Sequence, residues 1–223
     1  MFRCFFWHST IIEGVSPFSQ NRDLRRARLT VAMTGASGAL FTAHLLRLLN
    51  TDDRVEAVHF IASDHALRVV TEELSLTGGR SSLLETLLDS PPSSKFTVFR
   101  NDDIAAPVAS GSHPSDGMIV LPCSMGTLAS IANGMAARLV DRAADVTLKE
   151  QRPLILCVRE TPFNRIHLRN MMLAAEAGAV IYPVIPAMYF RPTSLDDVAR
   201  QYCCRVLGHI GLAQPSAYRW KED

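Results

Sequence analysis

This sequence of 223 residues has a net charge of only +1, five cysteines and no long unbroken apolar run. The 23 Lys and Arg residues nearly balance the 22 Asp and Glu residues, so the chain has no positive excess with which to bind nucleic acid or an anionic membrane. The five cysteines form no C-x-x-C, which predicts neither a disulfide framework nor a zinc site and favours a reducing compartment. The uncharged stretch 117–137 is interrupted by Pro122, Gly126 and Gly134, and therefore predicts a strand, a turn and a helix rather than a membrane span.

Residues 1–28 differ in composition from the rest of the chain. They hold five arginines against two acidic residues, a bias that is typical of an organelle transit peptide, with a translated leader or a disordered tail as the alternatives. We therefore expect an N-terminal extension over 1–28, one domain over 29–212 and a C-terminal tail over 213–223. The expected location is the cytoplasm, or the mitochondrion if residues 1–28 are a transit peptide.

From residue 29 onward, short apolar runs alternate with amphipathic stretches, which predicts a parallel sheet covered by helices on both faces. The fold class is a three-layer, flavodoxin-like or Rossmann-like α/β domain. Residues 77–94 are rich in Gly, Ser and Pro and are expected to form a surface excursion. The expected strands are 29–33, 55–62, 96–99, 117–121, 153–158 and 180–184, and the expected helices are 39–49, 64–74, one from 125, 139–150, 167–177 and 194–212.

Ligands of such folds bind at the carboxyl ends of the strands, which directs attention to loops 35–38, 63–64, 122–127, 159–162 and 186–192. The loop 35–38 precedes a helix whose free N–H groups suit a phosphate. A plain strand–helix turn without a ligand would have the same sequence pattern. The loop is not G-x-G-x-x-G, and Ser63 stands where a dinucleotide fold would have an acidic residue. A mononucleotide is therefore favoured over a dinucleotide. Ser124 and Thr127 add hydroxyls to the third loop, and helix capping would explain one of them.

Several charged residues are candidates for an anion site. Arg142 and Lys149 are seven residues apart and share a helix face, although such a pattern alone is more typical of a solvated helix. Arg205 lies at the edge of an apolar stripe, where an arginine usually has an anionic partner, either an internal carboxylate or a ligand phosphate. Arg159 and Glu160 follow a buried strand and are expected to point into the crevice.

Six segments, in order and with matching spacing, resemble the UbiX-type flavin prenyltransferases from about residue 29 to residue 212. They are 35–39 (G-A-S-G-A), 109–112 (A-S-G-S), 122–129 (P-C-S-M-G-T-L-A), 142–150 (R-A-A-D-V-T-L-K-E), 159–162 (R-E-T-P) and 186–192 (P-A-M-Y-F-R-P). The resemblance implies a homo-oligomer, commonly a dodecamer, with active sites at subunit contacts. It implies that reduced FMN and dimethylallyl phosphate combine into prenylated FMN, which serves a UbiD-type decarboxylase in ubiquinone synthesis or aromatic-acid metabolism.

The resemblance also implies roles for individual residues. Ser37, Glu73 and Glu160 would be catalytic, and Tyr189 and Arg205 would bind dimethylallyl phosphate, with Arg142 and Lys149 supplied across a subunit interface. The FMN contacts would be Ala36, Ser37, Gly38, Ser63, Ser124, Met125, Gly126, Thr127 and Arg159.

The residue types agree with this chemistry, because Arg and Lys can stabilise the charge left on phosphate when an allylic C–O bond breaks. No D-D-x-x-D occurs, so no metal requirement is expected. Two alternatives stay open. One is a flavin-dependent cysteine decarboxylase, although this chain has Asp103-Ile104-Ala105-Ala106 without the histidine that this family places there. The other is a non-catalytic flavin carrier subunit, which would not need a second phosphate site.

Overall fold

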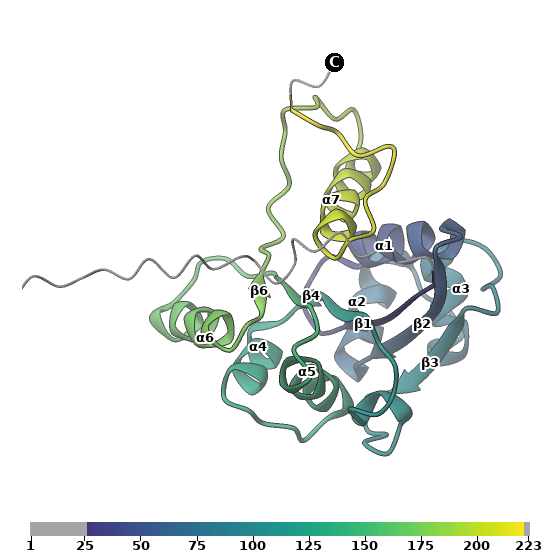
Figure 1. The fold of residues 1–223 in the computed structure, drawn as a ribbon. Helices are drawn as coiled ribbons and strands as arrows, with labels where there is room; N and C mark the ends of the chain where they lie inside the picture. Colours follow the sequence, from purple (N-terminus) through teal and green to yellow (C-terminus); the bar gives the residue numbers. More distant parts are fainter. Residues whose placement is uncertain (1–25, 221–223) are drawn as a thin grey trace, which may run out of the picture.

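The computed structural model describes residues 26–220 (Figure 1), so the prediction for the N-terminal extension lies almost wholly outside the described residues. Six strands form one parallel sheet in the order β3-β2-β1-β4-β5-β6. This order confirms the predicted α/β domain and is the doubly wound, Rossmann-like arrangement. The strands are β1 (Ala27–Met33), β2 (Val55–Ala62), β3 (Phe96–Arg100), β4 (Gly117–Cys123), β5 (Leu154–Val158) and β6 (Val180–Ile181).

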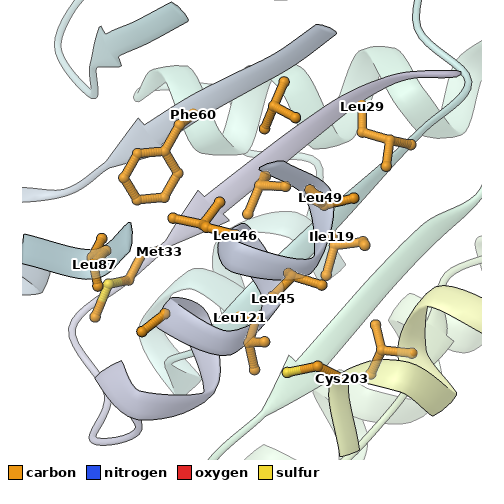
Figure 2. Close-up of a cluster of buried hydrophobic side chains, with 14 of the residues drawn as sticks. Leu29, Met33, Leu45, Leu46, Leu49, Phe60, Leu87, Ile119, Leu121 and Cys203 are labelled. Atoms are coloured by element: carbon orange, nitrogen blue, oxygen red, sulfur yellow. The ribbon is translucent and has the colours of Figure 1, made fainter. Parts of the chain in front are cut away.

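Helices cover both faces of the sheet and complete the three layers. The first face carries α1 (Ala39–Thr51), α2 (Asp64–Leu74), α3 (Leu83–Leu88) and α7 (Leu195–His209), and the second carries α4 (Met125–Ala132), α5 (Leu139–Lys149) and α6 (Arg165–Glu176). Figure 2 shows Met33, Leu46 and Phe60 within the first of the two resulting cores. Because each fully buried side chain of this size contributes about 1.5–3 kcal/mol, the two cores hold the sheet rigidly beneath its loops.

The strand order reverses between β1 and β4, since β2 and β3 lie on one side of β1 while β5 and β6 lie beyond β4. Ligands of doubly wound sheets bind in the crevice at this switch point, outside the carboxyl ends of the strands. The loops after β1 and β4 are the two that flank the crevice. The fold thus brings 35–38 and 122–127 together although they are far apart in the sequence.

The segment 77–94 is more structured than its composition suggested. It contains a short 3-10 helix, η1 (Gly79–Ser82), followed by α3, in which Leu83, Leu84, Leu87 and Leu88 are buried. The prediction of a surface excursion was wrong for these four leucines, whose helical spacing forms an apolar stripe against α1. The flanking glycines, serines and prolines obscured that stripe. Smaller differences concern α7, which ends at His209 rather than 212, and β6, which has two residues rather than five.

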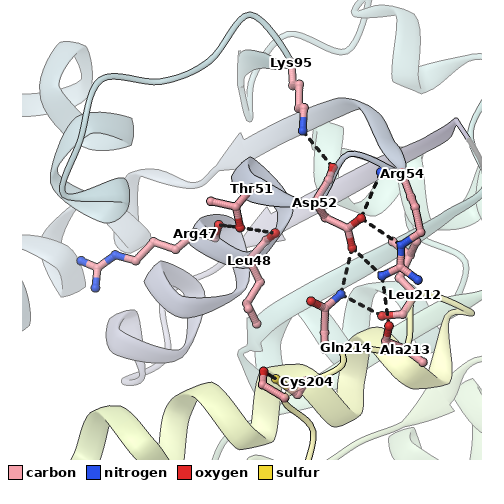
Figure 3. A network of polar contacts seen from close by, with 11 residues as sticks. Arg47, Leu48, Thr51, Asp52, Arg54, Lys95, Cys204, Leu212, Ala213 and Gln214 are labelled. Carbon is pink, nitrogen blue, oxygen red and sulfur yellow. Dashed lines mark hydrogen bonds and ion pairs between the residues drawn. The ribbon is translucent and has the colours of Figure 1, made fainter.

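Residues 213–220 fold back over the domain. Arg54 donates to the Asp52 carboxylate and to the Ala213 carbonyl at 3.0 Å, and Gln214 donates to the same carboxylate at 2.9 Å (Figure 3). The Arg54 guanidinium, helped by Gln214, lowers the pKa of Asp52 to about 2. The C-terminal segment is therefore tied to the turn between α1 and β2. Between residues 26 and 220, no helix has the length and apolar character that a membrane crossing needs.

Candidate functional site

Four of the five loops selected from the sequence are joined by hydrogen bonds at the carboxyl edge of the sheet. The Thr34 hydroxyl donates to the Pro122 carbonyl at 2.8 Å and accepts from the Ser124 amide at 2.8 Å. The Ser63 amide donates to the Met33 carbonyl at 3.1 Å, and the Arg159 amide to the Cys123 carbonyl at 3.1 Å. The structure thus brings the loops after β1, β2, β4 and β5 into one continuous edge.

Glycine is required where α2 packs against the first loop. A Cβ atom at Gly35 would overlap the Cβ atom of His65, so a side chain there would push α2 away from the sheet. Ser63 caps α2 by accepting from the Ala66 amide at 3.1 Å. Since Ser63 is itself buried, its hydroxyl lies beneath the edge, between β1 and α2.

In the loop 122–127, the hydroxyls of Ser124 and Thr127 interact with each other and with the start of α4. Ser124 caps α4 by accepting from the Thr127 amide at 3.4 Å, and its hydroxyl lies 3.2 Å from the Thr127 hydroxyl. Met125 is buried, while Gly126 is exposed and a Cβ there would meet nothing within 4 Å. The first turn of α4 therefore presents the open backbone of Gly126 to the crevice, while the Thr127 hydroxyl is buried behind Ser124.

Glu73 reaches from the last turn of α2 to the start of α1. Its carboxylate accepts from the Gly38 amide at 3.0 Å and from the Ala39 amide at 2.7 Å. The expectation that the N–H groups at the start of α1 are free for a phosphate is therefore wrong for these two amides, because Glu73 already accepts from them. A carboxylate at a helix N-terminus is electrostatically favourable, and it places Glu73 beside Ser37, which is exposed in the same loop.

Arg159 and Glu160 follow β5, as expected, and both side chains are exposed. Glu160 accepts from the Thr161 amide at 2.9 Å. The Arg159 guanidinium has neither a hydrogen bond nor an ion pair with any residue in the range 26–220. It is thus a cation at the edge without an internal counter-ion.

A separate cavity of about 590 Å³ lies beside α7, where the chain leaves β6. Tyr189 and Arg205 line it, together with five aromatic residues that the sequence motifs did not indicate: Tyr182, Phe190, Tyr202, Tyr218 and Trp220. The Tyr189 and Trp220 rings pack edge to face with centroids 4.7 Å apart. The short segment 213–223 holds a tyrosine and a tryptophan among few other apolar residues, which is the signal that could have drawn attention to it.

Arg205 is exposed on α7 and forms no ion pair with any carboxylate between residues 26 and 220. Of the two partners considered for it, an internal carboxylate is therefore not present within that range. Burial raises the pKa of Tyr182 and of Tyr202, so both phenols stay neutral. Tyr202 donates to the Tyr182 carbonyl at 3.0 Å, which fixes the floor of the cavity.

Arg142 and Lys149 lie elsewhere in the chain, on α5. Arg142 forms an ion pair with Asp145 at 3.0 Å, and Lys149 forms one with Glu150. Helix α5 starts beside Asn101, just past the carboxyl end of β3, and only the four residues 150–153 separate its end from β5. Lys149 is therefore at the opposite edge of the sheet from the loops described above, about 15 Å along the helix from its start. Within one chain, Arg142 and Lys149 do not meet Tyr189 and Arg205, since α5 and α7 cover opposite faces (Figure 1).

The cysteines Cys123, Cys157 and Cys203 are buried. Burial raises the pKa of Cys157 to about 12 and also raises that of Cys123 and Cys203, so these thiols stay protonated. Residues 26–220 contain no group of three or more His, Cys, Asp or Glu side chains placed to hold a metal ion.

Comparison with known proteins shows the family of the chain. The model of the flavoprotein family matches residues 17–199. The flavin prenyltransferase UbiX of Pseudomonas aeruginosa is 40% identical over 200 residues, which are 88% of this chain and 95% of that protein. The chain belongs to the UbiX family of flavin prenyltransferases. This confirms the resemblance identified in the sequence.

Solved structures of UbiX proteins share the fold closely. AnUbiX (PadA1), determined in complex with FMN and dimethylallyl pyrophosphate, is 42% identical with a TM-score of 0.78, over 88% of this chain and 98% of that one. A dodecameric FMN-dependent UbiX-like decarboxylase from Escherichia coli O157:H7 is 40% identical with a TM-score of 0.77, over 87% and 99% of the two chains. The cysteine decarboxylase TvaF is only 20% identical with a TM-score of 0.52, and that likeness concerns the fold alone.

Proposed function

We propose that this chain joins the dimethylallyl group of dimethylallyl phosphate to N5 and C6 of reduced FMN, giving prenylated FMN. The observation that carries the proposal is the presence of two separate places for an anion. One is the hydrogen-bonded edge with Arg159, and the other is the aromatic cavity with Arg205. A carrier that only held a flavin would need one phosphate site, whereas a prenyltransferase needs two.

The residues at the sheet edge fit FMN. The Ser37 hydroxyl, the open backbone at Gly126 and the Arg159 guanidinium are exposed around the crevice, and such donors suit a phosphate and the polar rim of a flavin. Hydrogen bonds and burial fix the supporting positions. The full set proposed to contact FMN is Ala36, Ser37, Gly38, Ser63, Ser124, Met125, Gly126, Thr127 and Arg159.

The catalytic roles follow from position and residue type. When bound, reduced FMN supplies the nucleophilic N5 and C6 atoms. Ser37 and Glu160 move protons at these atoms, as an exposed hydroxyl and an exposed carboxylate can. Glu73 fixes the loop that carries Ser37 through its bonds to Gly38 and Ala39, and its charge lies close to the reacting edge.

The cavity residues bind the prenyl donor. Arg205 stabilises the phosphate as the allylic C–O bond breaks, and the aromatic wall of Tyr189 faces the positive charge that develops on the prenyl group. Arg142 and Lys149 add positive charge from another copy of the chain, because within one chain they lie on a different face. The guanidinium and ammonium groups take the place of a metal ion.

The assembly is accordingly a homo-oligomer, and we propose a dodecamer, the state named for the UbiX-like structure from Escherichia coli O157:H7. Prenylated FMN passes to a UbiD-type decarboxylase, in ubiquinone synthesis or aromatic-acid metabolism. We assign the enzyme to the cytoplasm, or to the mitochondrion if residues 1–28 act as a transit peptide.

Mass spectrometry of the flavin tests the proposal directly. The protein is incubated without oxygen with reduced FMN and dimethylallyl phosphate, and the flavin is then extracted. A mass gain of one five-carbon prenyl unit is expected. An unchanged flavin together with decarboxylation of a peptidyl or phosphopantothenoyl cysteine substrate would support the decarboxylase instead. An unchanged flavin without decarboxylation would support the non-catalytic flavin carrier subunit.

A further inference from the structure

The loop 109–113 packs against α5 and the turn that follows it. It begins at the end of the 3-10 helix η2 (Pro107–Ala109) and leads towards β4. Its sequence Ala109-Ser110-Gly111-Ser112 is one of the segments that carry the family resemblance, and the function proposed above gives it no role. Every polar contact that it makes with α5, or with the turn after α5, involves a charged residue in the range 142–152.

Two of the residues that lie next to the loop are proposed to bind the substrate phosphate. The Arg142 Nε atom donates to the Ala109 carbonyl at 3.3 Å. A Cβ atom at Gly111 would lie 2.6 Å from Lys149 Nζ and would overlap the Glu150 carboxylate. The Gly111 backbone thus packs directly against the Lys149–Glu150 ion pair. The position of the loop therefore constrains the side chains of Arg142 and Lys149.

Arg152 holds the loop there. Its Nη1 atom donates to the His113 carbonyl at 3.0 Å and its Nη2 atom to the Gly111 carbonyl at 2.9 Å. The two carbonyls belong to residues two positions apart, so one planar guanidinium spans the turn between them. The rigid fork of arginine suits such a bridge, whereas lysine can reach one carbonyl as a point charge.

We propose that Arg152 is a positioning residue for the prenyltransferase reaction. By pinning Gly111 and His113, it keeps the loop 109–113 against α5, and the loop then holds Arg142 and Lys149 ready for the phosphate of the prenyl donor. Arg152 acts through these two residues and does not touch the substrate. The inference rests on the proposed function, because it assumes that Arg142 and Lys149 bind that phosphate.

Steady-state kinetics of Arg152→Met and Arg152→Lys test the proposal. We expect Arg152→Met to raise KM for dimethylallyl phosphate about tenfold, because a small misplacement of two charges weakens their contacts. The turnover number at saturating donor and the affinity for FMN should stay near those of the unaltered enzyme. Arg152→Lys should recover part of the loss. The matched control is Arg47→Met, which removes a guanidinium bonded to a backbone carbonyl, that of Leu87, at the junction of α1 and α3.

A second variant keeps the test decisive if Arg152→Met fails to fold. Gly111→Ala leaves Arg152 in place but introduces a Cβ atom where Lys149 and Glu150 lie, and it should raise the same KM. An unchanged KM in both variants would overturn the inference, as would an equal loss of FMN affinity, which would mark a general structural role. If the unaltered protein does not prenylate FMN, the proposed function fails instead, and the two failures are therefore distinguishable.

Discussion

Glu73 and Glu72 are adjacent on α2 and differ in what they touch. Glu73 accepts from the amides of Gly38 and Ala39, whereas Glu72 makes no hydrogen bond within residues 26–220. A single side chain thus connects the end of α2 with the start of α1, across 35 residues of sequence. This contact depends on the packing of two helices over the sheet, so the sequence alone could suggest the importance of Glu73 only by resemblance.

Glu73→Gln should separate the charge of this residue from its shape. The amide keeps one acceptor for the α1 amides but loses the negative charge at the helix N-terminus, which should cost about 0.3–1 kcal/mol of unfolding free energy. The rate of prenylation should fall by about 100-fold, because the proposed role of the carboxylate at the reacting edge needs its charge. Denaturant unfolding and single-turnover kinetics measure the two effects. Glu72→Gln is the matched control, and equal effects in both variants would contradict the role of Glu73.

Arg205→Ala is expected to affect the prenyl donor and to spare the flavin. Loss of a charge-assisted phosphate contact costs about 1.5–3 kcal/mol, so KM for dimethylallyl phosphate should rise by roughly 10- to 100-fold. The dissociation constant of FMN, measured by flavin fluorescence, should not change. Arg200→Ala on the same helix is the control, because Arg200 pairs with Asp197 and does not line the cavity. A parallel loss of FMN binding would mark Arg205 as structural.

At the scale of elements, the apolar runs predicted the strands correctly, whereas the Gly, Ser and Pro content of residues 77–94 hid helix α3. Strands β1, β2, β4 and β5 lie in the middle of the sheet. Strands β4 and β5 are buried throughout, and β1 and β2 are buried from Leu29 and Val58 onward, as a sheet covered on both faces requires. The four leucines of α3 had an equally clear helical spacing, but they stand within a stretch rich in Gly, Ser and Pro. Trp220 lay in a segment without periodicity, where only the tertiary structure could show a cavity wall.

The histidine pair between β2 and the loop 109–113 makes stability depend on pH. The rings of His59 and His113 are 4.7 Å apart, and neither His59 Nδ1 nor His113 Nε2 has a hydrogen-bond partner in the described range. Burial, reinforced by His113 and Arg28, lowers the pKa of His59 to about 4. The pKa of His113 is lowered too, mainly by burial and by Arg28.

Because the pKa of His59 is lower in the folded state, the unfolded chain binds more protons between pH 6.5 and 4. Stability should therefore fall as the pH falls through this window, by up to about 3 kcal/mol from His59. His59→Leu should flatten the dependence of the unfolding free energy on pH. His44→Gln keeps the pair intact and should keep the dependence. A slope that is identical in His59→Leu and the unaltered protein would refute this account.

At the scale of the whole molecule, one chain carries the two parts of the proposed phosphate site on different faces of the sheet. Mixed oligomers test whether they complement each other. Arg142→Ala subunits keep Arg205, and Arg205→Ala subunits keep Arg142, so an equal mixture should restore activity at about one quarter of the sites if each site draws on two chains. Each variant alone should be weakly active. No recovery on mixing and reassembly, or normal turnover by a monomer, would contradict a shared site.

Chelation tests how the assembled molecule stabilises the leaving phosphate. Arg205, Arg142 and Lys149 supply the positive charge in the proposed site, and the sequence has no D-D-x-x-D. Turnover should therefore be the same before and after treatment with EDTA. Activity that disappears with EDTA and returns with magnesium would show that a divalent ion is needed.

The position of Tyr218 and Trp220 in the chain has a consequence for synthesis. Both line the cavity with Arg205, yet both follow α7 and every strand of the sheet. The ribosome therefore synthesises all the loops proposed to contact FMN before it synthesises this wall of the cavity. A message with a stop codon just after α7 would still encode every residue proposed to contact FMN, but its product would lack Tyr218 and Trp220 from the wall of the proposed donor cavity. We therefore expect a protein that ends there to keep the proposed flavin site and to bind the prenyl donor weakly.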